Sequence, residues 1–207
     1  MPGARIPVGD PDSMPLKSYI LFFKPFGVLS QFSPMPGKKT LKDFGPFPPD
    51  VYSVGRLDAN TEGLLLLTND NNVKHRLTDP KFNHARTYLV QVEGTPDEES
   101  INRLEKGVVI DGKRTKPAQA MLLAEAPNLP PRPVPIRYRK SVPTAWIELT
   151  LREGRNRQVR KMTAAIGYPT LRLVRTKIGQ IGIGTLKPGE WRRLAGQEVE
   201  EAMGNAE

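Results

Sequence analysis

Four consecutive leucines constrain the fold of this chain more than any other stretch. Leu64–Leu67 follow Gly63 and lead into Thr68-Asn69-Asp70, so a short apolar run stands between turn-forming residues. One turn of a buried helix would also place leucines in a core. The shortness of the run and its polar exit favour a β-strand, and we predict that this strand is covered on both faces.

The loop before this strand carries a carboxylate beside a cation. Asp58 lies two residues after Arg56, on a loop that the buried strand would hold in place. Catalytic groups are commonly mounted on loops positioned by a rigid scaffold. An Asp followed by Asn and Thr is also a common turn or helix-capping residue, and Arg56 can be its surface partner. The spacing alone favours this structural role over catalysis.

The charge balance indicates a polyanionic partner. The 207 residues include 31 Lys and Arg against 22 Asp and Glu, which gives a net charge of +9. A domain this basic is expected to meet RNA, DNA or an acidic membrane surface. Because no run of 18 apolar residues exists, no transmembrane helix is expected, and the first ten residues lack the apolar core of a signal peptide.

The cysteine and histidine counts exclude several kinds of site. With no cysteine, the chain has no disulfide, no thiolate nucleophile and no cysteine-ligated zinc. Two histidines, His75 and His84, are too few for a histidine-rich metal site. We therefore expect a cytoplasmic protein that uses neither a metal nor a cofactor.

Composition divides the chain into a domain with two tails. Residues 1–16 are rich in Pro and Gly and predict a flexible arm, residues 17–196 form the domain, and residues 197–207 predict a frayed acidic tail. The segment 126–143 is rich in proline and arginine and has no core pattern. It is equally compatible with a solvated linker and with an arm that lies on phosphates.

Residue periodicity predicts the remaining elements. Strands are expected at 18–23 with a continuation over 28–32, and at 51–54, 88–93, 108–110, 117–123, 144–151, 171–174 and 190–194. A helix over 71–78 is expected to be capped by Asn71 and to stop before Pro80. A second helix is expected to follow an N-cap at Thr95 and to end at Gly107, and a third is expected over 156–166.

The third of these helices concentrates cations where a helix disfavours them. Its apolar face carries Val159, Met162 and Ile166, which should pack on the sheet. Cations occupy the opposite face in its N-terminal half and the preceding turn: Arg155, Arg157, Arg160 and Lys161. The helix dipole makes this end positive, so the arrangement favours anion binding over a merely solvated basic face.

Three motifs carry a family resemblance. The string from Gly55 to Asp70, with Thr and Gly at the third and fifth positions after Asp58, resembles the signature of pseudouridine synthases of the RsuA and RluA type. The stretch 153–162 (Glu-Gly-Arg-Asn-Arg-Gln-Val-Arg-Lys-Met) resembles the third motif of RsuA-type enzymes, and 86–88 (Arg-Thr-Tyr) resembles the segment that supplies their active-site tyrosine. The resemblance extends from about Tyr19 to Leu194.

The resemblance assigns roles to individual residues. It implies that Asp58 is catalytic, that Tyr88 is the active-site tyrosine and that Arg160 pairs with Asp58. The cations expected to bind RNA are Arg56, Arg86, Arg155, Arg157 and Lys161. The family reaction, isomerisation of uridine to pseudouridine, requires no metal and no cofactor.

The resemblance also implies a fold and a partner. The expected fold is α+β, with a large, mixed, mostly antiparallel sheet, flanking helices and a central basic cleft between two subdomains, without the additional S4-type RNA-binding domain. The expected partner is ribosomal RNA of the large subunit or a pre-ribosomal particle, and a monomer is expected. The alternative from another class is an RNA-binding module without catalysis. A carboxylate-dependent nuclease would need more acidic residues than Asp58 and Glu62.

Overall fold

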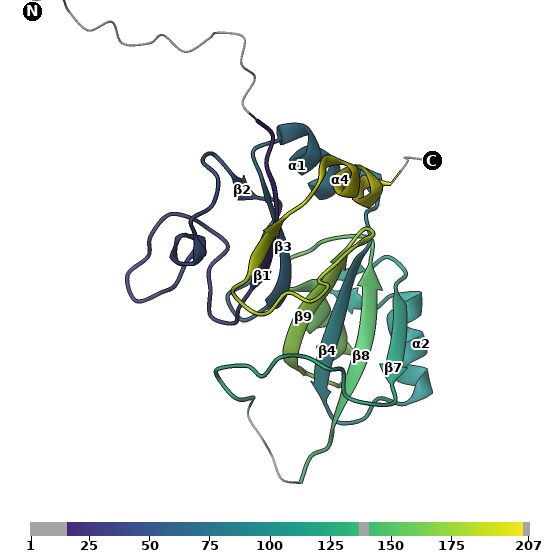
Figure 1. Cartoon of the computed structure of the whole chain (residues 1–207). Coiled ribbons are helices and arrows are strands. Elements are labelled where there is room, and N and C mark those ends of the chain that lie inside the picture. Colours follow the sequence, from purple (N-terminus) through teal and green to yellow (C-terminus); the bar gives the residue numbers. More distant parts are fainter. Residues whose placement is uncertain (1–15, 137–140, 205–207) are drawn as a thin grey trace, which may run out of the picture.

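One large sheet forms the centre of the protein (Figure 1). The computed structural model describes residues 16–136 and 141–204, so the predicted arm before residue 16 lies outside the described residues. The main path of the sheet runs in the order β11 (Trp191–Arg193), β1 (Tyr19–Lys24), β3 (Glu62–Thr68), β9 (Thr170–Ile178), β4 (Arg86–Glu93), β8 (Thr144–Leu151), β7 (Gln119–Leu123). β3 and β9 pair in parallel and the other neighbours along this path pair antiparallel. The prediction of a mixed, mostly antiparallel sheet is confirmed.

Short strands and helices complete the fold. β2 (Tyr52–Ser53) pairs with β3, β10 (Ile181–Gly182) pairs with β9, and a separate hairpin joins β5 (Val109–Ile110) to β6 (Lys113–Arg114). The α-helices are α1 (Asn71–Thr78), α2 (Glu98–Lys106), α3 (Gln158–Ala165) and α4 (Gly196–Met203). Two 3-10 turns lie at Leu41–Phe44 and Pro80–Phe82.

The leucine run is buried on both faces of the sheet, as predicted. Every residue of β3 is buried, and successive leucines enter different cores. Leu64 and Leu66 belong to a cluster with residues of α1 and α4, whereas Leu65 and Leu67 belong to a cluster lined by phenylalanines and Trp191. Burial of each leucine contributes about 2 kcal/mol, so β3 is a rigid support for the loop before it.

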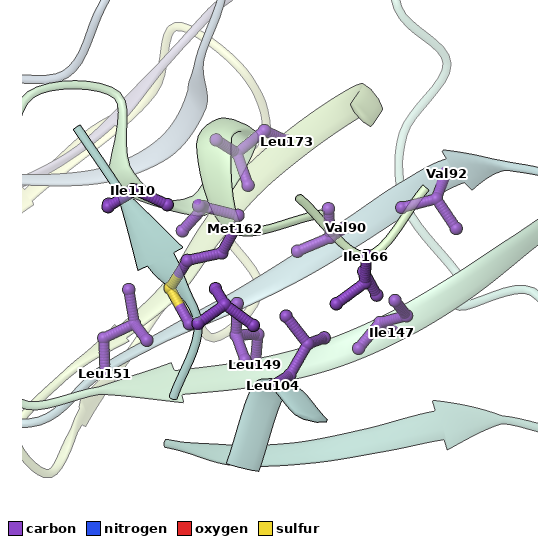
Figure 2. Packing of buried hydrophobic residues seen from close by; sticks show 12 residues of the cluster. Val90, Val92, Leu104, Ile110, Ile147, Leu149, Leu151, Met162, Ile166 and Leu173 are labelled. Carbon is purple, nitrogen blue, oxygen red and sulfur yellow. The ribbon is translucent and has the colours of Figure 1, made fainter. Parts of the chain in front are cut away.

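The other half of the sheet is covered by a separate core. Met162 of α3 and Leu104 of α2 pack with Val90 of β4 and with Ile147 and Leu149 of β8 (Figure 2). This packing confirms the apolar face predicted for the third helix, and it fixes the position of the turn that precedes α3.

Gly63 makes the junction between the two halves possible. β3 and β9 share two register pairs, Glu62 with Val174 and Gly63 with Arg175. Gly63 has φ +106°, and a Cβ built on it would lie 2.2 Å from the backbone oxygen of Arg175. Only glycine accepts both this backbone conformation and this close approach.

Lys24 ties the end of β1 to the neighbouring loops. Its side chain is fully buried, and its Nζ donates to the backbone oxygens of Pro25 at 3.0 Å and Val28 at 2.8 Å. Burial lowers the pKa of Lys24 from 10.5 to about 7, and the negative charges of Glu62 and Asp58 oppose that shift. The Lys-Pro pair therefore ends β1 with a buried amine that bonds to the following turn.

Helix termini differ from several predictions. α1 is capped by Asp70, whose carboxylate accepts from the backbone N–H groups of Asn72 and Val73, and α2 is capped by Asp97. Asn71 and Thr95 are therefore not the caps, because Asn71 is already the first residue of α1 and Thr95 lies two residues before the cap of α2. Residues 28–32 form no strand and contribute only an isolated bridge from Leu29 to Thr40.

Most of the segment predicted to be a frayed tail is helical, and residues 205–207 of that segment lie outside the described residues. α4 begins at Gly196, and its Val199 is buried in the core of α1 and β3. The carboxylate of Glu198 accepts two hydrogen bonds from the guanidinium of Arg192 and one from the backbone N–H of Ala195. Glutamate-rich sequence therefore packs as an amphipathic helix here.

Part of the proline-rich segment also contacts the domain. The backbone oxygen of Pro130 accepts from Arg172 at 2.8 Å, and the guanidinium of Arg132 lies over the ring of Phe26 at 4.3 Å. Residues 137–140 of this segment lie outside the described residues. The described part is anchored and is not a fully solvated linker.

Gly63→Ala should lower the free energy of unfolding by on the order of 3 kcal/mol, because the new methyl group meets β9 in a strained backbone conformation. Chemical denaturation of the purified variant measures this loss. Gly182→Ala is the matched control, because a Cβ there meets no atom within 4 Å. Equal losses in the two variants would contradict the junction argument.

The depressed pKa of Lys24 predicts a pH-dependent stability. Between about pH 7 and its ordinary pKa of 10.5, the unfolded state binds more protons at this group, so its contribution to stability rises with pH. Wild type should gain roughly 2 kcal/mol relative to Lys24→Met between about pH 7 and about pH 9. Denaturation curves at several pH values test this, and a constant difference would contradict it.

Candidate active site

A basic pocket of about 440 Å³ lies where the loop before β3 faces β4 and the turn into α3. Its volume is in the range of small-ligand sites. Asp58 and Glu153 are its acidic lining residues, and Tyr88 contributes an aromatic ring. Its cations are Arg56, Arg155, Arg157 and Arg160. The three sequence motifs therefore converge on one pocket.

The backbone around Asp58 is held from both sides. The hydroxyl of Ser30 accepts from the backbone N–H of Leu57 at 3.1 Å and donates to the backbone oxygen of Leu57 at 2.8 Å. The backbone oxygen of Ala59 accepts from Gly27 at 2.7 Å. The side chain of Asp58 remains 40% exposed. The loop thus presents an accessible carboxylate on a fixed backbone.

The cation paired with Asp58 is Arg157. Its Nη1 lies 3.1 Å from Oδ2 of Asp58 and 3.4 Å from Oδ1 of Asn60. The helix predicted from residue 156 begins at Gln158, so Arg157 is the N-cap and not part of a helical face. Its φ of +52° is a left-handed conformation that non-glycine residues rarely adopt.

Arg160 does not make the ion pair that the resemblance implied. Its Nη2 donates to the backbone oxygen of Asn60 at 2.7 Å and its Nη1 to that of Thr170 at 3.3 Å. Burial lowers the pKa of Arg160, and the charge of Arg157 lowers it further, whereas Asp58 raises it. Because α3 begins one residue after Arg157, Arg160 lies in its first turn and bonds to the loop backbone instead.

A hydrogen-bond network shapes the turn before α3. Oε1 of Glu153 accepts from Nε2 of Gln158 at 2.6 Å and from the backbone of Lys116 at 2.8 Å. Gln158 in turn accepts from the backbone of Arg155 at 2.9 Å. The guanidinium of Arg155 donates to backbone oxygens of the β5–β6 hairpin. Hydrogen bonds made by side chains of the third motif therefore stabilise the conformation of its turn.

The cations predicted to bind RNA fall into two groups. Arg56, Arg155 and Arg157 line the pocket, and the side chain of Arg56 is exposed. Arg86 and Lys161 do not line it: Arg86 donates to the backbone oxygen of Leu77, and Lys161 pairs with Asp111. The structure therefore brings three of the five together.

A buried ion pair that sequence reasoning missed lies next to the motif strand. Nε of Arg172 donates to Oε2 of Glu62 at 3.0 Å, and Nη2 of Arg172 donates to Oε1 at 2.8 Å. The side chain of Arg172 is 10% exposed and that of Glu62 is 2% exposed. Both carboxylate oxygens of Glu62 are thereby occupied, which disfavours the metal-dependent nuclease. Alternation along a strand would have placed Arg172 toward solvent, so its burial left no signal in the sequence.

Two features are absent from the described ranges, residues 16–136 and 141–204. These ranges contain no group of three or more His, Cys, Asp or Glu side chains arranged to hold a metal ion. They also contain no helix long and apolar enough to cross a membrane.

Comparisons with known proteins agree on one family. A family model for RNA pseudouridylate synthases matches residues 18–165. The chain is 54% identical over 175 residues to ribosomal large subunit pseudouridine synthase E of Xanthomonas campestris pv. campestris, which covers 84% of this chain and 93% of that protein. It is 47% identical over 178 residues to the protein of the same name from Vibrio parahaemolyticus, over 86% and 74% of the two chains.

A solved structure supports the same assignment. The crystal structure of a pseudouridylate synthase matches with a TM-score of 0.76 and 30% sequence identity, over 92% of this chain and 75% of that one. The motifs, the sheet and the relatives are consistent with one another. The chain belongs to the RNA pseudouridylate synthase family, whose members are isomerases.

Proposed function

We propose that this chain converts uridine to pseudouridine in large-subunit ribosomal RNA, with Asp58 as the catalytic residue. The observation that carries the proposal is the accessible carboxylate of Asp58, fixed on a rigid loop inside a basic pocket. The printed names of the relatives from Xanthomonas and Vibrio supply the substrate class. Such an enzyme would meet its RNA, or a pre-ribosomal particle, in the cytoplasm.

The reaction exchanges one glycosidic bond for another. Asp58 attacks the ribose or removes a ribose proton, and the C1′–N1 bond breaks. The uracil turns and rejoins through C5. A C1′–C5 bond forms as the bond from Asp58 to the ribose breaks, or as Asp58 returns the ribose proton, and the proton on C5 leaves while N1 gains a proton. The proposed isomerisation is written without a metal or a cofactor, because each bond that breaks in the nucleotide is replaced by one that forms and each proton that leaves is matched by one that is gained.

The pocket residues suit the steps around this chemistry. A uridine must leave its base stack to reach Asp58, which costs a few kcal/mol. Arg155 and Arg157 can bind flanking phosphates, and the exposed Arg56 can occupy the space that the base leaves. The ring of Tyr88, which lines the pocket, can stack on the uracil.

Asp58→Asn should reduce pseudouridine formation by on the order of a thousandfold or more, while RNA affinity persists or rises. Carbodiimide-stop primer extension on unmodified large-subunit rRNA, and on immature large subunits, measures the product. Asp50→Asn is the matched control, because Asp50 is exposed outside the active-site pocket and Asn tolerates its φ of +62°. Full activity of Asp58→Asn would favour the RNA-binding module without catalysis.

Two arginines of the third motif, Arg157 and Arg160, should differ in their effects. Arg157→Met removes an exposed partner of Asp58 and should lower the single-turnover rate about tenfold to a hundredfold with little change in stability. Arg160→Met leaves two backbone oxygens without their donor and should lower the free energy of unfolding by about 1–3 kcal/mol. Paired rate and denaturation measurements decide this, and the reverse pattern would refute the assignment.

A further inference from the structure

Arg175 is a buried cation with an incomplete set of partners. The residue is 4% exposed, and its Nε donates to the backbone oxygen of Leu64 at 2.8 Å. Within the described part of the chain, its Nη2 is buried without a hydrogen-bond partner. A buried charge costs several kcal/mol unless it is paired, so a cation in this position calls for a reason beyond packing.

The position of Arg175 links the two strands that support the pocket. On one side Arg175 is the register partner of Gly63 in β3, which follows the Asp58 loop. On the other side it is the register partner of Tyr88 in β4. Directly opposed residues of neighbouring strands project on the same face of a sheet, so the phenol and the guanidinium are neighbours.

An irregularity in the sheet produces this pairing. The register between β4 and β9 shifts between Thr87 and Tyr88, so that Thr87 opposes Lys177 whereas Tyr88 opposes Arg175. Bulges beside active sites commonly re-aim a side chain. Here the shift brings Tyr88 opposite Arg175, while the ring of Tyr88 lines the pocket.

The electrostatics are consistent with the register pairing of Arg175 and Tyr88. Burial lowers the pKa of Arg175, and the neighbouring Tyr88 opposes that shift. Arg172, buried on the same strand, has the carboxylate of Glu62 for a partner instead. Arg175 is thus the buried cation of β9 that faces the pocket tyrosine.

We infer that Arg175 is a positioning residue for the reaction, whose guanidinium holds the Tyr88 hydroxyl at a fixed place beside the Asp58 loop. The inference rests on the proposed function. Arg175 does not line the pocket, so it acts through Tyr88 and not on the RNA. A guanidinium N–H donates to the phenol oxygen, and the phenol keeps its own hydrogen for a partner in the pocket.

A double-mutant cycle tests the inference on the full-length protein. The rate is the single-turnover release of tritium from RNA labelled at uridine C5, since that hydrogen leaves during isomerisation. Arg175→Met should lower the rate about tenfold to a hundredfold with unchanged RNA affinity, because a misplaced group costs rate. In the Tyr88→Phe background the same change should cost less than about threefold. Arg175→Lys, which keeps the charge, replaces Arg175→Met if that variant fails to fold.

Arg172→Lys is the matched control, because it perturbs a buried arginine of the same strand that contacts Glu62. Its effect on rate should be the same with and without the Tyr88 hydroxyl. Equal losses from Arg175→Met in both backgrounds would overturn the inference and leave Arg175 with a structural role.

A second measurement does not depend on activity. The five tyrosines are replaced by 3-fluorotyrosine, and Tyr88→Phe identifies the fluorine resonance of Tyr88. Arg175→Lys should shift that resonance and Arg172→Lys should not, and an unmoved resonance would overturn the inference. If wild type released no tritium, the proposed function would fail, whereas the fluorine spectrum would still decide whether Arg175 holds Tyr88.

Discussion

The close parallel contact of β3 and β9 is the constraint on which the rest of the structure depends. It joins two half-sheets with separate cores, and it does so through the two register pairs at Glu62 and Gly63. The Asp58 loop enters at this contact from one half, and Tyr88 stands beside it from the other. A pocket assembled from both halves therefore keeps its geometry only while the contact between β3 and β9 holds. This explains why the contact contains a glycine, Gly63, where a side chain would separate the two strands.

Several buried charged residues lie near the contact between β3 and β9 and orient the strands and loops around it. Glu62, Arg172, Arg175 and Lys24 are all buried near the junction. Exchanging such pairs for apolar side chains is often neutral or stabilising in other proteins, so their value is not simply stability. Each basic side chain donates a hydrogen bond to a backbone oxygen: Arg175 to that of Leu64, Arg172 to that of Pro130 and Lys24 to that of Val28. They fix the orientation of strands and loops that apolar packing alone would leave free to slide.

Sequence patterns predicted the helices and strands better than they predicted the side-chain contacts between those elements. Alternation located β8 and the leucine run located β3, because burial imposes those patterns directly. The resemblance implied Arg160 as the partner of Asp58, whereas the structure pairs Asp58 with Arg157. The helix begins two residues later than predicted, so Arg157 is its N-cap and not part of a helical face. Arg172 and Arg175 left no signal, because the four successive residues from Arg172 to Arg175 are all buried and include no solvent-facing position of the kind that alternation assumes.

The position of Asp58 depends on its backbone more than on its ion pair. The pair with Arg157 is about two-fifths exposed on both sides, and exposed pairs contribute only about 0–1 kcal/mol. The bonds from Ser30 and Gly27, together with Arg160 on Asn60, hold the backbone on either side of the carboxylate. Arg157 can therefore exchange its contact with Asp58 for one with a phosphate at small cost. A rigid carboxylate beside an exchangeable cation is the arrangement that a polyanionic substrate requires.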